Sequence, residues 1–137
     1  MRFLVLRNHK YKNGLDVHEY LDNGIIRISE DEHFDWEGEK ISFSKTMHLL
    51  FQAVGKQAFL KNKRFSLGMY EFISLGLSKS IDSATSNRSL ERIKSLIAAV
   101  PELEEAKKFS GIGSRGSQRL ASFVLPMAEK FFAAQSS

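Results

Sequence analysis

The chain has 137 residues, of which 42% are hydrophobic and 26% charged, a balance typical of a soluble globular protein with one core. It contains no cysteine, which excludes disulfide bonds, thiol catalysis and cysteine-ligated zinc. No apolar run approaches the ~20 residues of a membrane-spanning helix, and the apolar run at residues 2–7 is too short for a signal peptide. We therefore expect a single domain over 1–137, located in the cytoplasm and without a membrane partner.

The net charge of +4 is distributed unevenly along the chain. Residues 1–55 hold seven Lys/Arg and nine Asp/Glu, a balance of −2, whereas residues 56–137 hold thirteen and seven, a balance of +6. A basic half is typical of a chain that binds a polyanion, and also of an ordinary solvent-exposed basic face. Charge alone leaves both interpretations open.

Hydrophobic spacing predicts an all-α bundle of about five to six helices. The short apolar stretches at 2–7 and 25–28 fit a helix or a strand, so one short N-terminal extended segment stays open. Asp16 is placed to cap a short helix, which Asn23 and Gly24 are expected to close.

The acidic segment 30–39 sets Phe34 and Trp36 among six carboxylates. The carboxylates match no EF-hand or other metal-binding loop, and the four histidines show no zinc-binding spacing. We expect an exposed loop pinned by the two rings, with no metal and no cofactor in this chain.

Three helices with regular apolar spacing are predicted in the middle of the chain. The first begins at Ser42, the second begins near Leu67 and is apolar enough to be buried, and the third covers 90–100 after a polar loop over 78–89. Asn87 is expected to cap the third helix. The core-facing stripe of the first helix is expected to be Phe43, Met47, Leu50, Val54 and Ala58.

Two further helices are predicted after Pro101. The first has glutamates in its first turns, lysines in its last and Gly111 just past its end, which is the charge order that the helix dipole favours. The second runs from residue 114 or 117 toward Phe132, and Pro126 should kink it or start a new turn because proline lacks a backbone N–H. The tail 133–137 is expected to fray.

A glycine-rich turn, 109–113, leads into the last helix. It resembles the hairpin of the helix-hairpin-helix DNA-binding motif, in which backbone amides hold a phosphate without base specificity. Gly116 departs from that motif, since the second helix has normally begun there, and a helix C-cap alone explains Gly111. With the basic turn at 61–64, the predicted nucleic-acid-binding residues are Lys61, Lys63, Arg64, Gly111, Gly113, Arg115 and Arg119.

The chain shows no catalytic signature. It has no GxSxG elbow and no P-loop, and no predicted strand precedes the glycines at 111 and 113 to support dinucleotide binding. We therefore expect a non-catalytic protein, and enzyme activity is the third-ranked hypothesis with no substrate indicated.

A longer resemblance covers most of the chain. It is carried by residues 4–7, 15–22, 43–50, 55–59, 63–65 and 69–72, together with the closing Gly113-Ser114-Arg115 and Arg119. In these helix-packing patterns the chain resembles the C-terminal helical portion of the bacterial family headed by a ParB/sulfiredoxin-like domain and typified by GmrSD-type restriction systems. The family's DGQQR-like motif and HNH partner segment do not occur here, so no catalytic residue is carried over.

The resemblance implies the C-terminal part of a larger protein, as a truncated member or an excised domain. Its implied role is a non-catalytic helical domain in restriction and phage defence, which contacts DNA or an α/β nuclease or NTPase subunit through its basic C-terminal half. The alternative is a protein-interaction or homodimerisation module without nucleic-acid binding. That alternative is motivated by eleven phenylalanines, a large number for one small core.

Overall fold

The computed structural model describes residues 2–11, 15–61, 64–83, 90–108 and 116–134. Its regular elements are helical except for a two-residue antiparallel ladder, so the predicted all-α class is confirmed. In chain order they are α1 (Arg2–Asn8), α2 (Val17–Glu30), α3 (Trp36–Val54), the 3-10 turn Gly55–Gln57, β1 (Leu60–Lys61), β2 (Arg64–Phe65), α4 (Leu67–Ser83), α5 (Leu90–Ala99), the 3-10 turn Val100–Glu102, α6 (Glu104–Lys108), α7 (Gly116–Arg119), the π-helical segment Leu120–Val124 and α8 (Leu125–Ala134).

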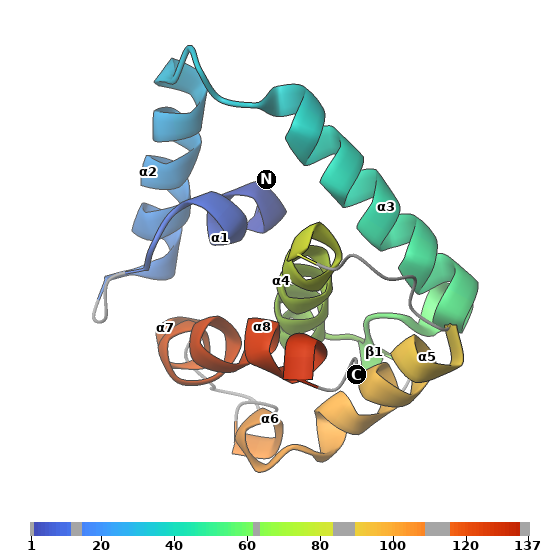
Figure 1. The fold of residues 1–137 in the computed structure, drawn as a ribbon. Coiled ribbons are helices and arrows are strands. Elements are labelled where there is room, and N and C mark those ends of the chain that lie inside the picture. Colours follow the sequence, from blue (N-terminus) through green and yellow to red (C-terminus); the bar gives the residue numbers. More distant parts are fainter. Residues whose placement is uncertain (1, 12–14, 62–63, 84–89, 109–115, 135–137) are drawn as a thin grey trace.

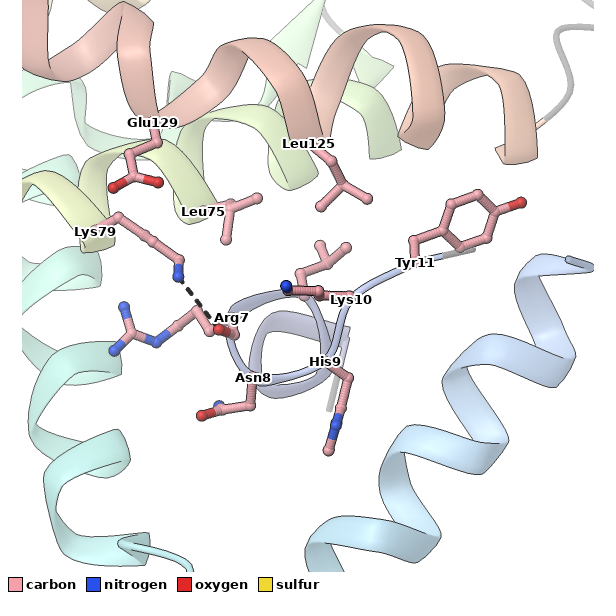
Figure 2. A pocket seen from close by; sticks show the side chains of 10 residues that line it. Arg7, Asn8, His9, Lys10, Tyr11, Leu75, Lys79, Leu125 and Glu129 are labelled. Atoms are coloured by element: carbon pink, nitrogen blue, oxygen red, sulfur yellow. Dashed lines mark hydrogen bonds between the residues drawn. The ribbon is translucent and has the colours of Figure 1, made fainter. Parts of the chain in front are cut away.

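Helix α4 occupies the centre of the bundle (Figure 1). It contacts α1, α3 and, most extensively, α8, while α1 lies between α2 and α4. The C-terminal end of α1 faces Leu75 of α4 and Leu125 of α8 (Figure 2). The helix predicted to begin near Leu67 and to be buried is therefore confirmed, and it forms the centre of the core.

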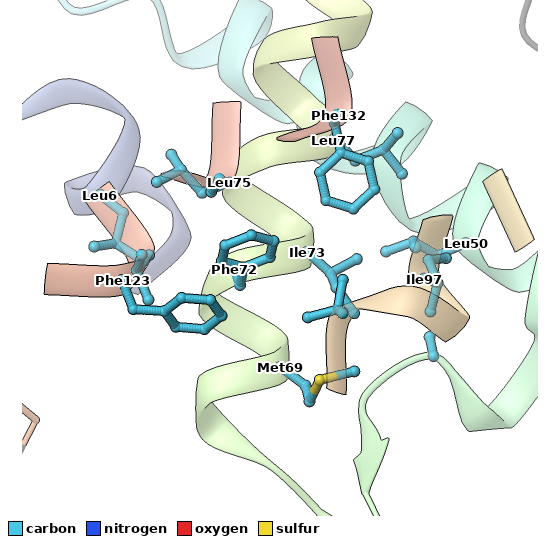
Figure 3. Close-up of a cluster of buried hydrophobic side chains, with 14 of the residues drawn as sticks. Leu6, Leu50, Met69, Phe72, Ile73, Leu75, Leu77, Ile97, Phe123 and Phe132 are labelled. Carbon is cyan, nitrogen blue, oxygen red and sulfur yellow. The ribbon is translucent and has the colours of Figure 1, made fainter. Parts of the chain in front are cut away.

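The core is built on both sides of α4. Figure 3 shows Phe72 and Ile73 of α4 with Phe123 on one side and Leu50 and Ile97 on the other. The rings of Phe72 and Phe123 are stacked, with centroids 4.3 Å apart. Each fully buried side chain of this kind contributes about 1.5–3 kcal/mol through burial, so this cluster accounts for much of the packing energy that holds the helices together.

Gly76 sets how closely α8 approaches α4. A Cβ at this position would lie 2.6 Å from Cδ2 of Phe132 and still closer to the carbonyl oxygen of Ala128. The obstructing atoms include the backbone of α8, which cannot swing aside as a flexible side chain can. A larger residue at position 76 would therefore have to push the two helices apart.

The N-terminal region differs from its prediction. Residues 2–7 lie in α1 and residues 25–28 continue α2, so neither forms the extended segment that the sequence left open. Asp16 caps α2 as predicted, accepting a hydrogen bond from the Glu19 backbone N–H at 3.2 Å. The prediction that Gly24 closes this helix is wrong: a Cβ there would lie 2.5 Å from Cγ1 of Val5, so this glycine serves the close approach of α1 and α2.

The acidic segment is shorter as a loop than predicted, because residues 36–39 form the first turn of α3. Asp35 caps this helix by accepting a hydrogen bond from the Gly38 N–H at 2.9 Å. The rings of Phe34 and Trp36 pack edge to face, 4.8 Å apart. The two aromatics therefore contact each other across the cap, as expected for a pinned connection.

The predicted core stripe of α3 is only partly right. Leu50 is buried, and Met47 and Val54 are partly buried against the core. Phe43 is 42% exposed, and Phe51, beside the stripe, is 66% exposed. The buried face instead runs through Thr46, whose hydroxyl donates to the Ser42 carbonyl oxygen at 2.7 Å. Because this internal hydrogen bond lets a polar residue be buried, Thr46 takes the place in the buried face that hydrophobic spacing assigned to Phe43.

Helix α4 extends to Ser83, so the predicted loop over 78–89 is wrong for its first six residues. Ser78 tolerates burial because its hydroxyl donates to the Leu75 carbonyl oxygen and accepts from Arg7. Helix α5 lies within the predicted range 90–100 and buries Ile93, Leu96 and Ile97, while its expected cap, Asn87, lies outside the described residues.

The last helix contains a π-helical segment in place of a simple kink. Within it the backbone N–H of Leu125 donates to the carbonyl oxygen of Leu120, five residues earlier. Pro126 comes next and has no backbone N–H to donate. A π-turn is one arrangement by which neighbouring carbonyl groups of such a helix still accept hydrogen bonds. Residues 133 and 134 are helical, and the rest of the tail that was expected to fray lies outside the described residues.

Candidate functional site

The structure places few of the predicted nucleic-acid-binding residues. Arg64 is exposed on β2, and Lys61 lies in β1 with its backbone alone described. Of the other five residues only Arg119 is described, since Lys63, Gly111, Gly113 and Arg115 lie outside the described residues. Among the predicted cations, the structure therefore describes the side chains of Arg64 and Arg119 alone.

Arg119 is part of a buried ion cluster. Its Nε lies 2.6 Å from Oε1 of Glu71, and Nη1 of Arg2 lies 2.7 Å from the other carboxylate oxygen. The Glu71 side chain is fully buried, and the arginine side chains are 22% (Arg2) and 12% (Arg119) exposed. This Arg2–Glu71–Arg119 cluster ties α1 and α7 to α4, a structural role for Arg119 that the sequence pattern did not indicate.

Two tyrosines have perturbed pKa values. Burial, reinforced by the negative charge of Glu71, raises the pKa of Tyr20 to about 12. Burial also raises the pKa of Tyr70, opposed by the positive charge of Arg2. Both shifts move away from neutral pH, so each phenol stays protonated under ordinary conditions and neither is poised to act as a general base.

A second ion pair connects α1 with α3. The Nε of Arg7 lies 2.8 Å from Oε2 of Glu39, and its Nη1 donates to the Ser78 hydroxyl at 2.8 Å. Both members of this pair are largely buried. The pair therefore fixes the spacing of α1 and α3 at the point where a surface groove lies between them.

That groove, here called the aromatic groove, has a volume of about 340 Å³. Phe3 and Phe43 pack edge to face, with ring centroids 5.2 Å apart. Trp36 and Phe43 keep 41% and 42% of their surface exposed. The full lining consists of Phe3, Leu4, Trp36, Glu39, Lys40, Phe43 and Ser44.

Exposed carboxylates, here called the acidic rim, lie close to Trp36 in sequence. They lie on the end of α2, in the connection to α3 and in the first turn of α3, namely Glu30, Asp31, Glu32, Asp35 and Glu37. Its one described ion pair joins Glu37 to Lys40 at 3.6 Å between highly exposed side chains. Such a pair contributes little, so the rim presents a negative potential beside two exposed aromatic rings.

A larger hollow, here called the α1 pocket, lies where α1 ends against α4 and α8 (Figure 2). It has a volume of about 540 Å³ and is open to solvent. Leucines from all three helices form its floor, and two lysines and a glutamate contribute to its wall. It is thus both apolar and charged, unlike the aromatic groove.

Sequence patterns missed both hollows. The rings of the aromatic groove were assigned to the core or to a pinned loop, and the available signal was the dense run of carboxylates around Trp36. Nothing in the sequence brings residues 6–11 next to Lys79 and Glu129, because that contact depends on how three distant helices pack.

The described residues restrict the chemistry further. Among them, no group of three or more histidine, aspartate or glutamate side chains is placed to hold a metal ion. None of the helices in this part of the chain is long and apolar enough to cross a membrane.

No family model, curated protein or solved structure matches the chain. The resemblance to the helical portion of GmrSD-type restriction proteins therefore stays a prediction.

Proposed function

We propose that this chain is a non-catalytic interaction domain that binds a basic, partly apolar segment of a partner protein in the aromatic groove. The observation that carries the proposal is the exposure of Trp36 and Phe43 in one groove beside the acidic rim. Tryptophan and other aromatic residues are the side chains that most often dominate binding energy at protein interfaces.

The groove is held open by its surroundings. The Arg7–Glu39 pair fixes α1 against α3, and the Asp35 cap fixes the turn that carries Trp36. A preformed groove loses little conformational entropy when a partner binds, so more of the contact energy is retained as affinity.

The acidic rim defines the charge of the partner. A segment with lysine or arginine beside its apolar residues is attracted to the rim, whereas an acidic segment is repelled. An amphipathic helix with apolar side chains three or four residues apart fits this arrangement, because such side chains lie on one face and enter a groove together.

The single tryptophan of the chain provides the test. Trp36 is the only tryptophan, so its fluorescence reports on the aromatic groove without interference. We expect a synthetic amphipathic peptide with leucines on one face and lysines on its flanks to shift Trp36 emission. The same peptide with glutamates in place of lysines should bind at least about fivefold more weakly at low salt.

Two variants of α3 distinguish binding in the groove from nonspecific hydrophobic binding. Phe43→Ala removes a groove ring and should weaken the peptide by about tenfold or more. Phe51→Ala removes an even more exposed ring on the same helix that does not line the groove, and should leave the affinity unchanged. Equal loss in both variants, or no response of Trp36 to any basic apolar peptide, rejects the proposal.

A second candidate function is nucleic-acid binding by the basic C-terminal half. It is supported by the +6 balance of residues 56–137 and by the exposure of Arg64, Lys94 and Lys108. Binding through phosphates predicts an affinity for duplex DNA that falls steeply with salt concentration. Absence of binding to duplex and single-stranded DNA at ~50 mM salt excludes this function.

The resemblance to restriction systems is the basis for one specific partner. On that basis an α/β nuclease or NTPase subunit of a phage-defence system is the partner expected at the basic C-terminal half, a contact distinct from the aromatic groove. A homodimer is the other arrangement, and light scattering across a concentration series distinguishes the two.

A further inference from the structure

The α1 pocket is assembled from three helices that are distant in sequence. The end of α1 supplies residues 6–11, α4 supplies Leu75 and Lys79, and α8 supplies Leu125 and Glu129. Its volume of about 540 Å³ lies within the range of about 300–1,000 Å³ typical of small-molecule sites. These helices belong to the central packing of the fold, so the pocket is part of the folded framework.

The floor of the pocket is apolar. Leu6 and Leu75 are almost fully buried, and Leu125 is partly exposed. Figure 2 shows Leu75 and Leu125 over the end of α1. A hydrocarbon or ring placed on this floor would be removed from water on one side. It would gain roughly 25 cal/mol for each Å² of apolar surface that it covers.

The charges in the wall are unequal. Lys10 and Lys79 contribute two amines, and Glu129 contributes one carboxylate. Arg7 also lines the pocket, but its guanidinium is matched by Glu39. The balance is one unmatched positive charge beside an apolar floor.

Lys79 is held at the edge of the pocket by the backbone of α1. Its Nζ donates to the carbonyl oxygen of Arg7 at 3.3 Å, and its side chain is half-buried (Figure 2). Within the described part of the chain this carbonyl is the one acceptor that Nζ meets, although an ammonium group carries three donors. The remaining donors are available to an anionic group in the pocket.

We propose that the α1 pocket binds a small amphipathic carboxylate. The apolar body of the ligand lies on the floor formed by Leu6, Leu75 and Leu125, and its carboxylate is bound between Lys10 and Lys79. The carboxylate of Glu129 repels the ligand carboxylate, so removing the charge of Glu129 should strengthen binding.

Decanoate, used as a dissolved monomer, is the probe. Titration into the isotopically labelled protein should shift backbone amide NMR signals of residues 6–11 and of the facing residues of α4 and α8. Decanol, which has the same chain without the charge, should bind at least about fivefold more weakly, and decyltrimethylammonium should bind more weakly still.

Substitutions test the charge pattern in both directions. Lys79→Met should weaken decanoate by about fivefold or more, whereas Lys79→Arg should largely restore it. Glu129→Gln should strengthen decanoate by about two- to fivefold, a gain that a purely structural role of Glu129 does not explain. Lys94→Met, which changes an exposed lysine of α5, is the matched control and should have no effect.

Thermal unfolding of each variant identifies any loss of folding, and the Lys79→Arg and Glu129→Gln variants keep the test valid if Lys79→Met is unstable. Three results overturn the proposal: equal binding of decanol and decanoate, weaker binding after Glu129→Gln, or amide shifts confined to the aromatic groove. Binding to vesicles of anionic lipid in the absence of any decanoate binding also overturns it, because that result indicates a surface charge effect.

Discussion

Replacing Glu71 by glutamine should destabilise the protein strongly, although the two side chains have nearly the same size and shape. The side chain keeps its shape but loses its charge, which leaves the guanidinium groups of Arg2 and Arg119 facing each other across a neutral amide. Breaking a buried ion pair by neutralising one partner costs about 3–5 kcal/mol. Because both arginines keep some exposure to water, we expect a value near the lower end of that range.

The expected loss can be converted into a melting temperature. Unfolding entropies near 2.1 cal/mol/K per residue, applied to 137 residues, turn a loss of about 3 kcal/mol into a fall in Tm of about 10 °C. Urea denaturation followed by circular dichroism measures the free energy, and a thermal scan measures Tm. Glu37→Gln is the matched control, since that side chain is 82% exposed and should change stability by less than about 0.5 kcal/mol.

A combined substitution tests whether burial of charge is the cause. Replacing the whole cluster, with Arg2→Met, Glu71→Leu and Arg119→Met together, removes the buried charges and should restore at least wild-type stability, as apolar replacements of buried ion clusters often do. A loss below about 1 kcal/mol for Glu71→Gln would refute the reasoning, because it would mean that the carboxylate is neither buried nor paired as the structure shows.

Three further predictions concern packing, titration and capping. Gly76→Ala should cost about 2–3 kcal/mol in urea denaturation, in spite of alanine's higher helix propensity, because α8 blocks the added methyl group; Gly68→Ala should cost less, because the added methyl group would meet the side chain of Arg119 and not the backbone of a helix. The raised pKa of Tyr20 means that its contribution to stability is complete below about pH 10 and declines by about 2–3 kcal/mol as pH rises through 12; Tyr20→Phe should remove that decline, and an unchanged pH profile would contradict it. Asp16→Ala should cost about 1 kcal/mol by removing the cap of α2, whereas an equal loss from Asp22→Ala would show that capping is not responsible.

Helical spacing predicted the all-α class and the buried helix at the centre, because both depend on local periodicity. The role of Gly24 could not be predicted in the same way, since a glycine that ends a helix and a glycine that admits a neighbouring helix look alike in sequence. The difference lies in Val5, nineteen residues away, whose side chain occupies the space beside Gly24.

The Arg2–Glu71–Arg119 cluster could not be predicted from local sequence patterns either. Glu71 and Arg119 are 48 positions apart, so their pairing appears only once α4 and α7 are packed together. One signal was present nevertheless: Glu71 is a lone carboxylate in the apolar stretch from Met69 to Leu77. A charged residue within a largely apolar stretch of a helix indicates a buried partner elsewhere in the chain.

The π-helical segment before Pro126 accommodates one residue more than an α-helix of the same length would hold. Deleting a single residue from 120–124 would allow this stretch to close into a regular α-helix with little rotation of α7 relative to α8, because the π-turn already absorbs one extra residue. A deletion between 126 and 131 has no such compensation and would rotate the two ends of the helix by about 100° relative to each other. After the second kind of deletion, Arg119 could not face Glu71 while Phe132 kept its place in the core. Related chains that lack one residue within 120–124 should therefore keep both Glu71 and the arginine that pairs with it, whereas chains with a gap between 126 and 131 should have lost both.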